Sequence, residues 1–141
     1  PDVVIGPDHK LYPESHPDHL RVGEAVSKAY FMCSNVNMMK SVGATQIAKP
    51  MVLAYYFTGK PNRFVKITKK DFEKTKAAYA CFVSQCPPPD NGKSLMLYMR
   101  LKVRLNGLRS FHIRADAFRV MNNMHIHCCG EAEDTAIRRP L

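Results

Sequence analysis

The residues best suited to chemistry are four potential metal ligands within one short run, His125-Ile126-His127-Cys128-Cys129. A structural zinc site takes four ligands, usually as two spaced pairs that close a loop. No second His or Cys pair with suitable spacing accompanies this run, and on a helix its side chains would point in different directions. The sequence therefore predicts no metal site and no cofactor.

Recognisable catalytic motifs are also missing from the sequence. It contains no GxSxG, P-loop, GxGxxG or HExxH pattern. Nothing selects one nucleophile–base pair from the five cysteines and six histidines. Residues 25–130 hold only four acids, and one of them, Asp71, is expected to cap a helix. We therefore predict that the chain is not an enzyme.

The positive chemical signal is a strong excess of basic residues. The 141 residues include 21 Lys and Arg against 12 Asp and Glu, a net charge of +9 at pH 7. Acids concentrate near both ends, so residues 25–130 carry 17 bases and four acids, a net charge of +13. Such a charge attracts polyanions. A hydrophobic fraction of 45% is typical of a globular domain, and no apolar run is long enough to span a membrane.

Basic residues alternate with large apolar residues between positions 93 and 119. An exposed apolar patch with a basic rim is typical of a membrane or protein-contact surface. The same pattern also fits a buried helix whose charged side chains reach out to solvent. We predict a surface that binds anionic membranes, formed by the basic residues Lys93, Arg100, Lys102, Arg104, Arg109, Arg114 and Arg119 and by the apolar residues Met96, Tyr98 and Met99.

Apolar residues recur with helical spacing over much of the chain. The spacing predicts a helix over about 18–41, a shorter one over 47–58 and a third over about 69–85. The third has the clearest start, because Thr68-x-x-Asp71 is a variant of the capping box.

The second half of the chain is less clearly patterned. Residues 93–113 fit both an alternating strand and a helix, and their many Leu and Met residues favour the helix. Residues 115–129 also favour a helix. The predicted fold is an all-α, up-and-down bundle of about five helices, with an all-β module as the less favoured alternative. Residues 1–19 would form an extended acidic arm, 18–129 a single helical domain, and 130–141 a C-terminal tail.

The order and spacing of these elements resemble the acrosomal sperm proteins of abalone, and most closely the fusagenic sperm proteins, which are diverged relatives of lysin. The resemblance covers roughly residues 16–126 and rests on five segments: His16-Pro17-Asp18-His19-Leu20, Leu53-Ala54-Tyr55-Tyr56-Phe57, Lys69 to Gln85, Pro87 to Gly92, and Val120 to Met124. It implies a non-catalytic helical bundle that is secreted, stored in the sperm acrosomal vesicle and active in sperm–egg interaction.

Charge and resemblance together favour a secreted protein that binds and perturbs anionic membranes and mediates sperm–egg membrane fusion. Its partner would be an anionic membrane surface or an egg-surface component, and its exposed apolar surface could support a homodimer. Two alternatives stay open. The basic run could follow a nucleic-acid backbone, but no nucleic-acid motif is present, so the sequence disfavours such a partner. Residues 111–128 also faintly resemble the closing strands of a zona-pellucida-type interaction module.

Overall fold

The protein has a mixed α/β architecture, in contrast to the predicted all-α bundle. The structure is a computed structural model, and it describes residues 1–11 and 14–122. These residues form four α-helices and a four-stranded sheet with the strand order β1-β2-β4-β3. The described residues divide into two compact units, one formed by residues 1–11, 14–63 and 117–122 and the other by residues 64–116.

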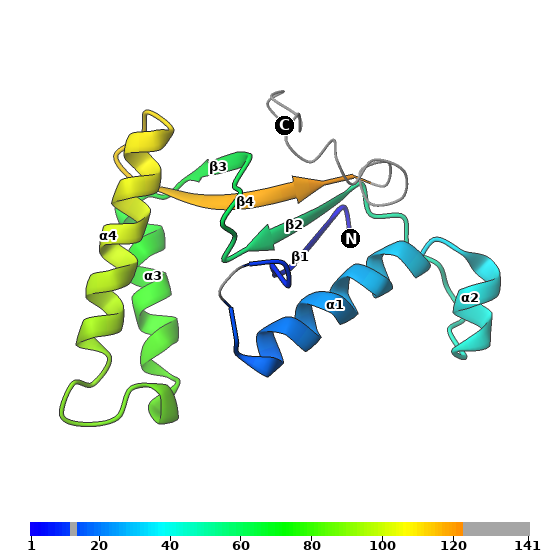
Figure 1. Ribbon diagram of the computed structural model, residues 1–141, viewed down its shortest axis with the longest axis horizontal. Coiled ribbons are helices and arrows are strands. Elements are labelled where there is room, and N and C mark those ends of the chain that lie inside the picture. The colour runs from blue at the N-terminus through cyan, green and yellow to red at the C-terminus, as the bar shows by residue number, and fades with distance from the viewer. Residues whose placement is uncertain (12–13, 123–141) are drawn as a thin grey trace. The chain divides into compact units, whose positions relative to one another are not determined.

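Three strands of the sheet organise the first unit. β1 (Val3–Pro7) pairs in parallel with β2 (Val52–Tyr56), so the two strands end at the same edge (Figure 1). β4 (Ala115–Met121) runs antiparallel on the other side of β2, with Leu53 opposite Met121. Four of the five residues of β2 are buried, as expected for a strand with neighbours on both sides.

Helix α1 (Pro17–Met32) follows β1 along the chain and packs closely on it. The approach requires Gly23, because a Cβ there would lie 2.6 Å from the carbonyl oxygen of Pro7. The core formed by Tyr30, Leu53, Tyr55 and Met121 lies between α1 and the sheet. A short helix, α2 (Val36–Ser41), follows.

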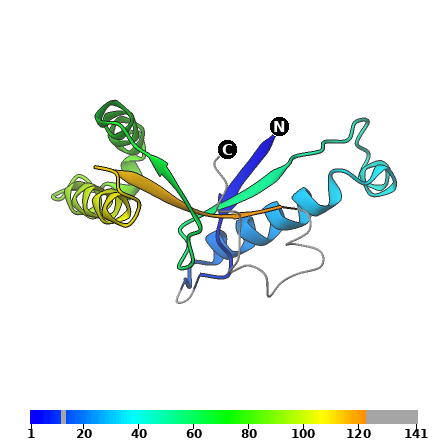
Figure 2. The same ribbon diagram turned by 90° about the horizontal axis from the view of Figure 1, so that it is seen from above.

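The second unit contains two helices that lie side by side (Figures 1 and 2). Strand β3 (Arg63–Lys66) leads into α3 (Lys69–Ala80), and a 3-10 turn, η1 (Val83–Gln85), follows it. Helix α4 (Lys93–Arg109) then runs beside α3, as both views show (Figures 1 and 2). None of the helices in the described ranges is both long and apolar enough to cross a membrane.

The prediction of a helix over 47–58 is wrong, because this segment contains β2. Its helical spacing was a coincidence within a continuous apolar run. A strand buried on both faces carries no polar alternation, so periodicity cannot distinguish it from a buried helix. The segment predicted as an extended arm likewise contains β1, which is paired with β2.

The helix predicted from residue 115 is also wrong, because residues 115–121 form β4. Its partner strand, β2, lies far away in the sequence, so no local pattern reveals the pairing. The remainder of that predicted helix, the His and Cys run at 125–129 and the predicted C-terminal tail lie outside the described residues.

Helices at three predicted places are confirmed, with changed ends. The segment 18–41 contains α1 and α2, separated at residues 33–35. Residues 93–109 form a helix rather than a strand. The start of α3 is as predicted: Thr68 accepts a hydrogen bond from the backbone N–H of Asp71, and the Asp71 carboxylate accepts one from the backbone N–H of Thr68.

The capping box generates a test of local stability. Replacing Thr68 by Ala removes the acceptor for a helix-end N–H, so we expect the free energy of unfolding to fall by about 1 kcal/mol. Urea denaturation measures this change. Thr75→Ala is the matched control, because the Thr75 hydroxyl donates to the carbonyl of Asp71 within the helix and caps nothing. Equal losses in the two variants would contradict the capping role.

Candidate functional site

The carboxyl ends of β1 and β2 mark the candidate site. These strands are parallel neighbours, with Pro7 in register with Tyr56. In α/β sheets, ligands bind outside the carboxyl ends of such strands. The residues with polar or aromatic side chains that follow these ends or stand at the start of α1 include Asp8, His9, Glu14, His16, His19 and Phe57.

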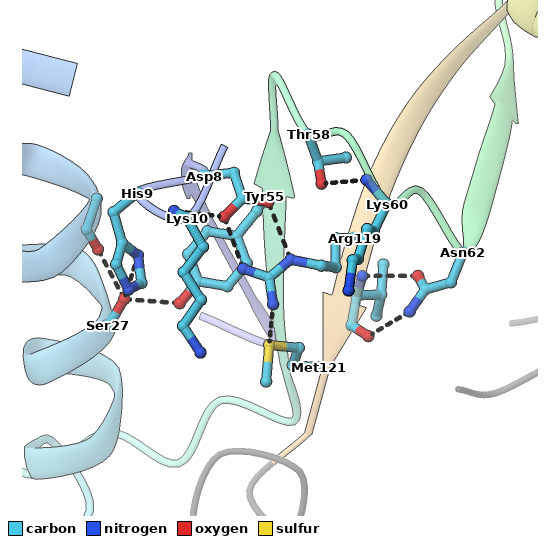
Figure 3. A network of polar contacts seen from close by, with 12 residues as sticks. Asp8, His9, Lys10, Ser27, Tyr55, Thr58, Lys60, Asn62, Arg119 and Met121 are labelled. Atoms are coloured by element: carbon cyan, nitrogen blue, oxygen red, sulfur yellow. Dashed lines mark hydrogen bonds and ion pairs between the residues drawn. The ribbon is translucent and has the colours of Figure 1, made fainter. Parts of the chain in front are cut away.

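A buried ion pair anchors the chain directly after β1. Arg119 on β4 donates from Nε to Asp8 Oδ2 at 2.9 Å and from Nη2 to Asp8 Oδ1 at 2.6 Å (Figure 3). Asp8 is 5% exposed and Arg119 is 3% exposed. The guanidinium also lies over the ring of Tyr55, 4.6 Å from its centroid. This two-pronged, charge-assisted contact fixes the position of Asp8 relative to the sheet.

The pKa of Asp8 reflects two opposing effects. Burial raises the pKa of this carboxyl group, but hydrogen bonds from Arg119, Thr58 and the backbone N–H of Lys10, together with the charge of Arg119, lower it. The lowering effects are larger in sum, so the pKa lies below its ordinary value. Asp8 is therefore ionised at neutral pH and forms a true ion pair.

His9 belongs to a separate contact between the β1 end and α1. The hydroxyl of Ser27 donates to the carbonyl of Gly23 at 2.7 Å and contacts the hydroxyl of Tyr55 at 2.6 Å and Nδ1 of His9 at 3.5 Å (Figure 3). Burial lowers the pKa of His9, although the charge of Asp8 opposes this effect. Because the single Ser27 proton goes to Gly23, we assign Ser27 a structural role and not that of a nucleophile.

Glu14, His16 and His19 form a cluster at the start of α1. Nδ1 of His19 lies 2.9 Å from Glu14 Oε2, and the rings of His16 and His19 are stacked with centroids 4.7 Å apart. The backbone N–H of His16 donates to Glu14 Oε1 at 2.8 Å. The hydrogen bond from His19, followed by that from the His16 backbone, lowers the pKa of Glu14. The carboxylate thus holds both histidine positions.

The hydrogen bonds assign different protons to the two rings. His16 caps α1, because its Nδ1 accepts from the backbone N–H of Asp18 at 3.3 Å, so the neutral ring carries its proton on Nε2. His19 donates from Nδ1 to the Glu14 carboxylate, so in the neutral imidazole its Nε2 has a lone pair. The cluster therefore offers one hydrogen-bond donor and one proton acceptor.

Phe57, the first residue after β2, connects the second strand end to this cluster. Its ring lies 6.2 Å from that of His19, centroid to centroid. Its φ is 51°, in the left-handed region that non-glycine residues seldom adopt. Such backbone strain is concentrated at ligand-binding and active sites.

The lone pair on His19 Nε2 could also coordinate a metal ion. A histidine whose other ring nitrogen donates to a carboxylate is the usual form of a metal-ligating histidine. Catalytic zinc takes three protein ligands. Within residues 1–11 and 14–122, no group of three His, Cys, Asp or Glu side chains is placed to hold a metal ion. His19 could supply one ligand of such a set, and the described residues do not complete it.

The residues predicted from the basic run lie mainly on α4. Lys93, Met96 and Arg100 line a pocket of about 340 Å³ beside α3. Lys102 is half-buried. Burial lowers the pKa of its ammonium group, although the nearby charge of Asp116 opposes this effect. The others on this helix are Tyr98, Met99, Arg104 and Arg109. Arg114 precedes β4, and Arg119 differs from all of them because it is buried against Asp8. Contact of the exposed members with an anionic surface stays a prediction.

The histidine cluster is not among the site residues predicted from the sequence. One local signal was present: His16 and His19 are spaced i, i+3 where a helix begins, directly after a proline-rich segment. A second was the run Val3-Val4-Ile5, whose β-branched residues favour a strand. The decisive fact, the parallel pairing of β1 with β2, connects segments about fifty residues apart and has no local signature.

Comparison with known proteins finds a chain that is similar to a hydrolase. No family model matches the chain. The chain is homologous to diacetylchitobiose deacetylase of Thermococcus kodakarensis, with 31% identity over 133 residues, which is 92% of this chain and 48% of the relative. The chain therefore spans about half the length of this enzyme.

A solved structure agrees with the sequence comparison. The N,N′-diacetylchitobiose deacetylase from Pyrococcus horikoshii, complexed with its inhibitor MPG, matches with a TM-score of 0.75 and 27% identity over 94% of this chain and 50% of that one. The fold is Rossmann-like. These findings overturn the resemblance to abalone sperm proteins, the predicted membrane-fusion function and the predicted non-enzymatic character.

The buried ion pair generates a test of stability. Arg119→Ala leaves the Asp8 carboxylate buried without its main partner, so we expect a loss of about 3–5 kcal/mol in the free energy of unfolding. Denaturant titration measures it. The double variant Asp8→Leu/Arg119→Met removes both charges and should lose much less. Lys28→Ala is the matched control, because it breaks an exposed ion pair with Glu24 in the same unit and should cost about 0–0.5 kcal/mol. A loss from Arg119→Ala as small as that of the control would contradict the argument.

The lowered pKa of Asp8 predicts how stability changes in acid. A carboxyl group whose pKa is lower in the folded state stabilises the fold above its unfolded pKa, and this stabilisation disappears as pH falls through the folded value. The free energy of unfolding should therefore decline below about pH 4. The decline should be shallower in Asp8→Leu/Arg119→Met. Asp18→Asn, which changes an exposed carboxylate on α1, should leave the slope unchanged. Identical slopes in all three proteins would exclude Asp8 as the source.

Proposed function

We propose that the protein forms part of a hydrolase that removes the acetyl group from an N-acetylated amino sugar. The observation that carries this proposal is the combination of two facts. The chain matches a diacetylchitobiose deacetylase over 92% of its own length. Its histidine cluster also lies at the strand edge where α/β proteins bind ligands.

The protonation pattern of the cluster suits amide hydrolysis. Water adds to the acetyl carbonyl carbon, the carbon–nitrogen bond breaks, and the products are acetate and a free amine. His19 can take the proton from water at Nε2 and return it to the departing nitrogen. The Nε2–H of His16 can donate a hydrogen bond to the carbonyl oxygen and stabilise the negative charge that develops there.

Glu14 acts as a positioning residue in this scheme. Its carboxylate accepts from Nδ1 of His19 and holds that ring in the tautomer that leaves Nε2 unprotonated. It also accepts from the backbone of His16 and so fixes the spacing of the two rings. Loss of the Glu14 charge should weaken proton acceptance by His19 without removing it.

The proposal is tested by measuring acetate release from N,N′-diacetylchitobiose, using the full polypeptide that carries this sequence. His19→Ala should lower kcat/KM by about 10²–10⁴-fold if the imidazole transfers the proton. Glu14→Gln should lower it by about 10–100-fold, by analogy with loss of an outer-shell carboxylate, and should shift the acidic limb of the pH profile. His112→Ala, an exposed histidine in the other unit, is the control and should retain full activity.

The possible outcomes separate the function from the site. No acetate release by the unaltered polypeptide would refute the deacetylase proposal. Normal activity in His19→Ala would leave the deacetylase proposal standing and refute the site. Activity that is lost with a chelator and restored by Zn²⁺, together with loss of zinc binding in His19→Ala, would assign His19 Nε2 to metal coordination instead of proton transfer.

A further inference from the structure

A small pocket in the second unit is lined mostly by cations. It has a volume of about 160 Å³, and its lining residues are Lys69, Phe72, Glu73, Arg100, Arg104 and Arg114. Four of these six side chains are positively charged and one is negatively charged. All six belong to residues 64–116, so the pocket is complete within this unit.

The secondary structure brings these cations together from three segments. Lys69 is the first residue of α3, where the helix dipole adds partial positive charge. Arg100 and Arg104 are four residues apart on α4, so they lie on one face of that helix. Arg114 is held beside the start of α3, because the backbone N–H of Ile67 donates to its carbonyl oxygen at 3.0 Å.

Gly107 allows the backbone around Arg114 to lie close to α4. It is buried near the end of α4, and a Cβ at this position would lie 2.6 Å from the carbonyl oxygen of His112 and 2.9 Å from Cα of Arg114. Only glycine permits so close a contact between the helix and the returning chain. Arg114 is therefore held close to α4 by the backbone as well as to α3.

The charges around the pocket are not balanced by protein carboxylates. In the part of the chain that the structure describes, none of the four cations forms an ion pair. The one lining carboxylate, Glu73, lies 3.8 Å from Nζ of Lys76, which is its own partner. By contrast, the buried Arg119 forms an ion pair with Asp8. Because the four cations of the pocket make no ion pair within the described residues, their combined field attracts an anion to the pocket.

We propose that this pocket binds a tetrahedral oxyanion, the phosphate or sulfate group of a small molecule. Guanidinium groups suit this ligand, because their fixed N–H donors match two oxygens of a phosphate at once. The pocket is small, and the buried ring of Phe72 contributes to its wall. It therefore suits one oxyanion group rather than an extended polyanion. This site is independent of the histidine cluster and of the proposed deacetylase function.

Isothermal titration calorimetry with inorganic phosphate tests the proposal directly, at an ionic strength held constant with sodium chloride. We expect saturable binding with one site per chain. Arg104→Gln should weaken binding about tenfold, as expected for one charge-assisted contact. Lys69→Gln should weaken it by a smaller factor. Lys74→Gln, which removes an exposed lysine of α3 outside the pocket, is the matched control and should bind as the unaltered protein does.

Glu73→Gln provides a test in the opposite direction. Removing the one carboxylate from the pocket lining should strengthen phosphate binding several-fold, which no purely destabilising change would do. Circular dichroism of each variant monitors folding. Glucose 6-phosphate and sulfate, titrated in parallel, distinguish a sugar phosphate from a free inorganic ion as the preferred source of the group.

Three results would overturn the proposal. The first is the absence of phosphate binding up to tens of millimolar. The second is equal weakening by Lys74→Gln and Lys69→Gln, which would show diffuse attraction to the whole basic surface. The third is much tighter binding of a single-stranded oligonucleotide with a steep salt dependence, which would mean that the arginines belong to an extended nucleic-acid surface.

Discussion

The ion pair between Asp8 and Arg119 is the contact on which the arrangement of the first unit depends. Its partners are 111 residues apart in the sequence, and both are almost completely buried. Two unpaired charges in that position would be very costly, so the geometry must be satisfied for the unit to fold. The pair connects β4 to the end of β1 across β2, and it therefore fixes the edge at which the two parallel strands end.

The histidine cluster is built outward from that fixed edge. The backbone N–H of Asp8 bonds to the carbonyl of Tyr56 beyond the last strand pair, so the chain leaves β1 in a defined direction. At the other end of the segment, His16 caps α1, and Gly23 allows that helix to lie directly against β1. The stacked rings are thus carried by a helix start that is packed on the sheet. This placement is more precise than a free loop would give.

Local signals predicted the helices of the second unit and failed for the sheet. Thr68 and Asp71 interact over three residues, so their pattern could be recognised without any tertiary context. The alternation of Leu and Arg over 93–109 was ambiguous, and helix propensity decided it correctly. Strand β2 carries no alternation, because both its faces are buried, and the role of β4 depends on its pairing with β2. The histidines could not be identified as a site without those pairings. The pairings decide which strand ends lie together, and therefore whether the histidines stand at a ligand-binding edge of the sheet.

The net charge likewise did not show where individual basic residues lie in the fold. Arg119 and Arg104 belong to the same basic run in the sequence, yet their surroundings are opposite. Arg119 lies on a central strand, where burial demands a carboxylate partner and Asp8 supplies it. Arg104 lies on an exposed helix face beside other cations, where hydration makes an unpaired charge tolerable. A buried arginine therefore specifies the fold, whereas a cluster of exposed arginines adds little stability and stays available to a ligand. Solvent exposure decides whether an arginine is held in a buried ion pair or stays available to a ligand. The order of charges along the sequence does not contain this information.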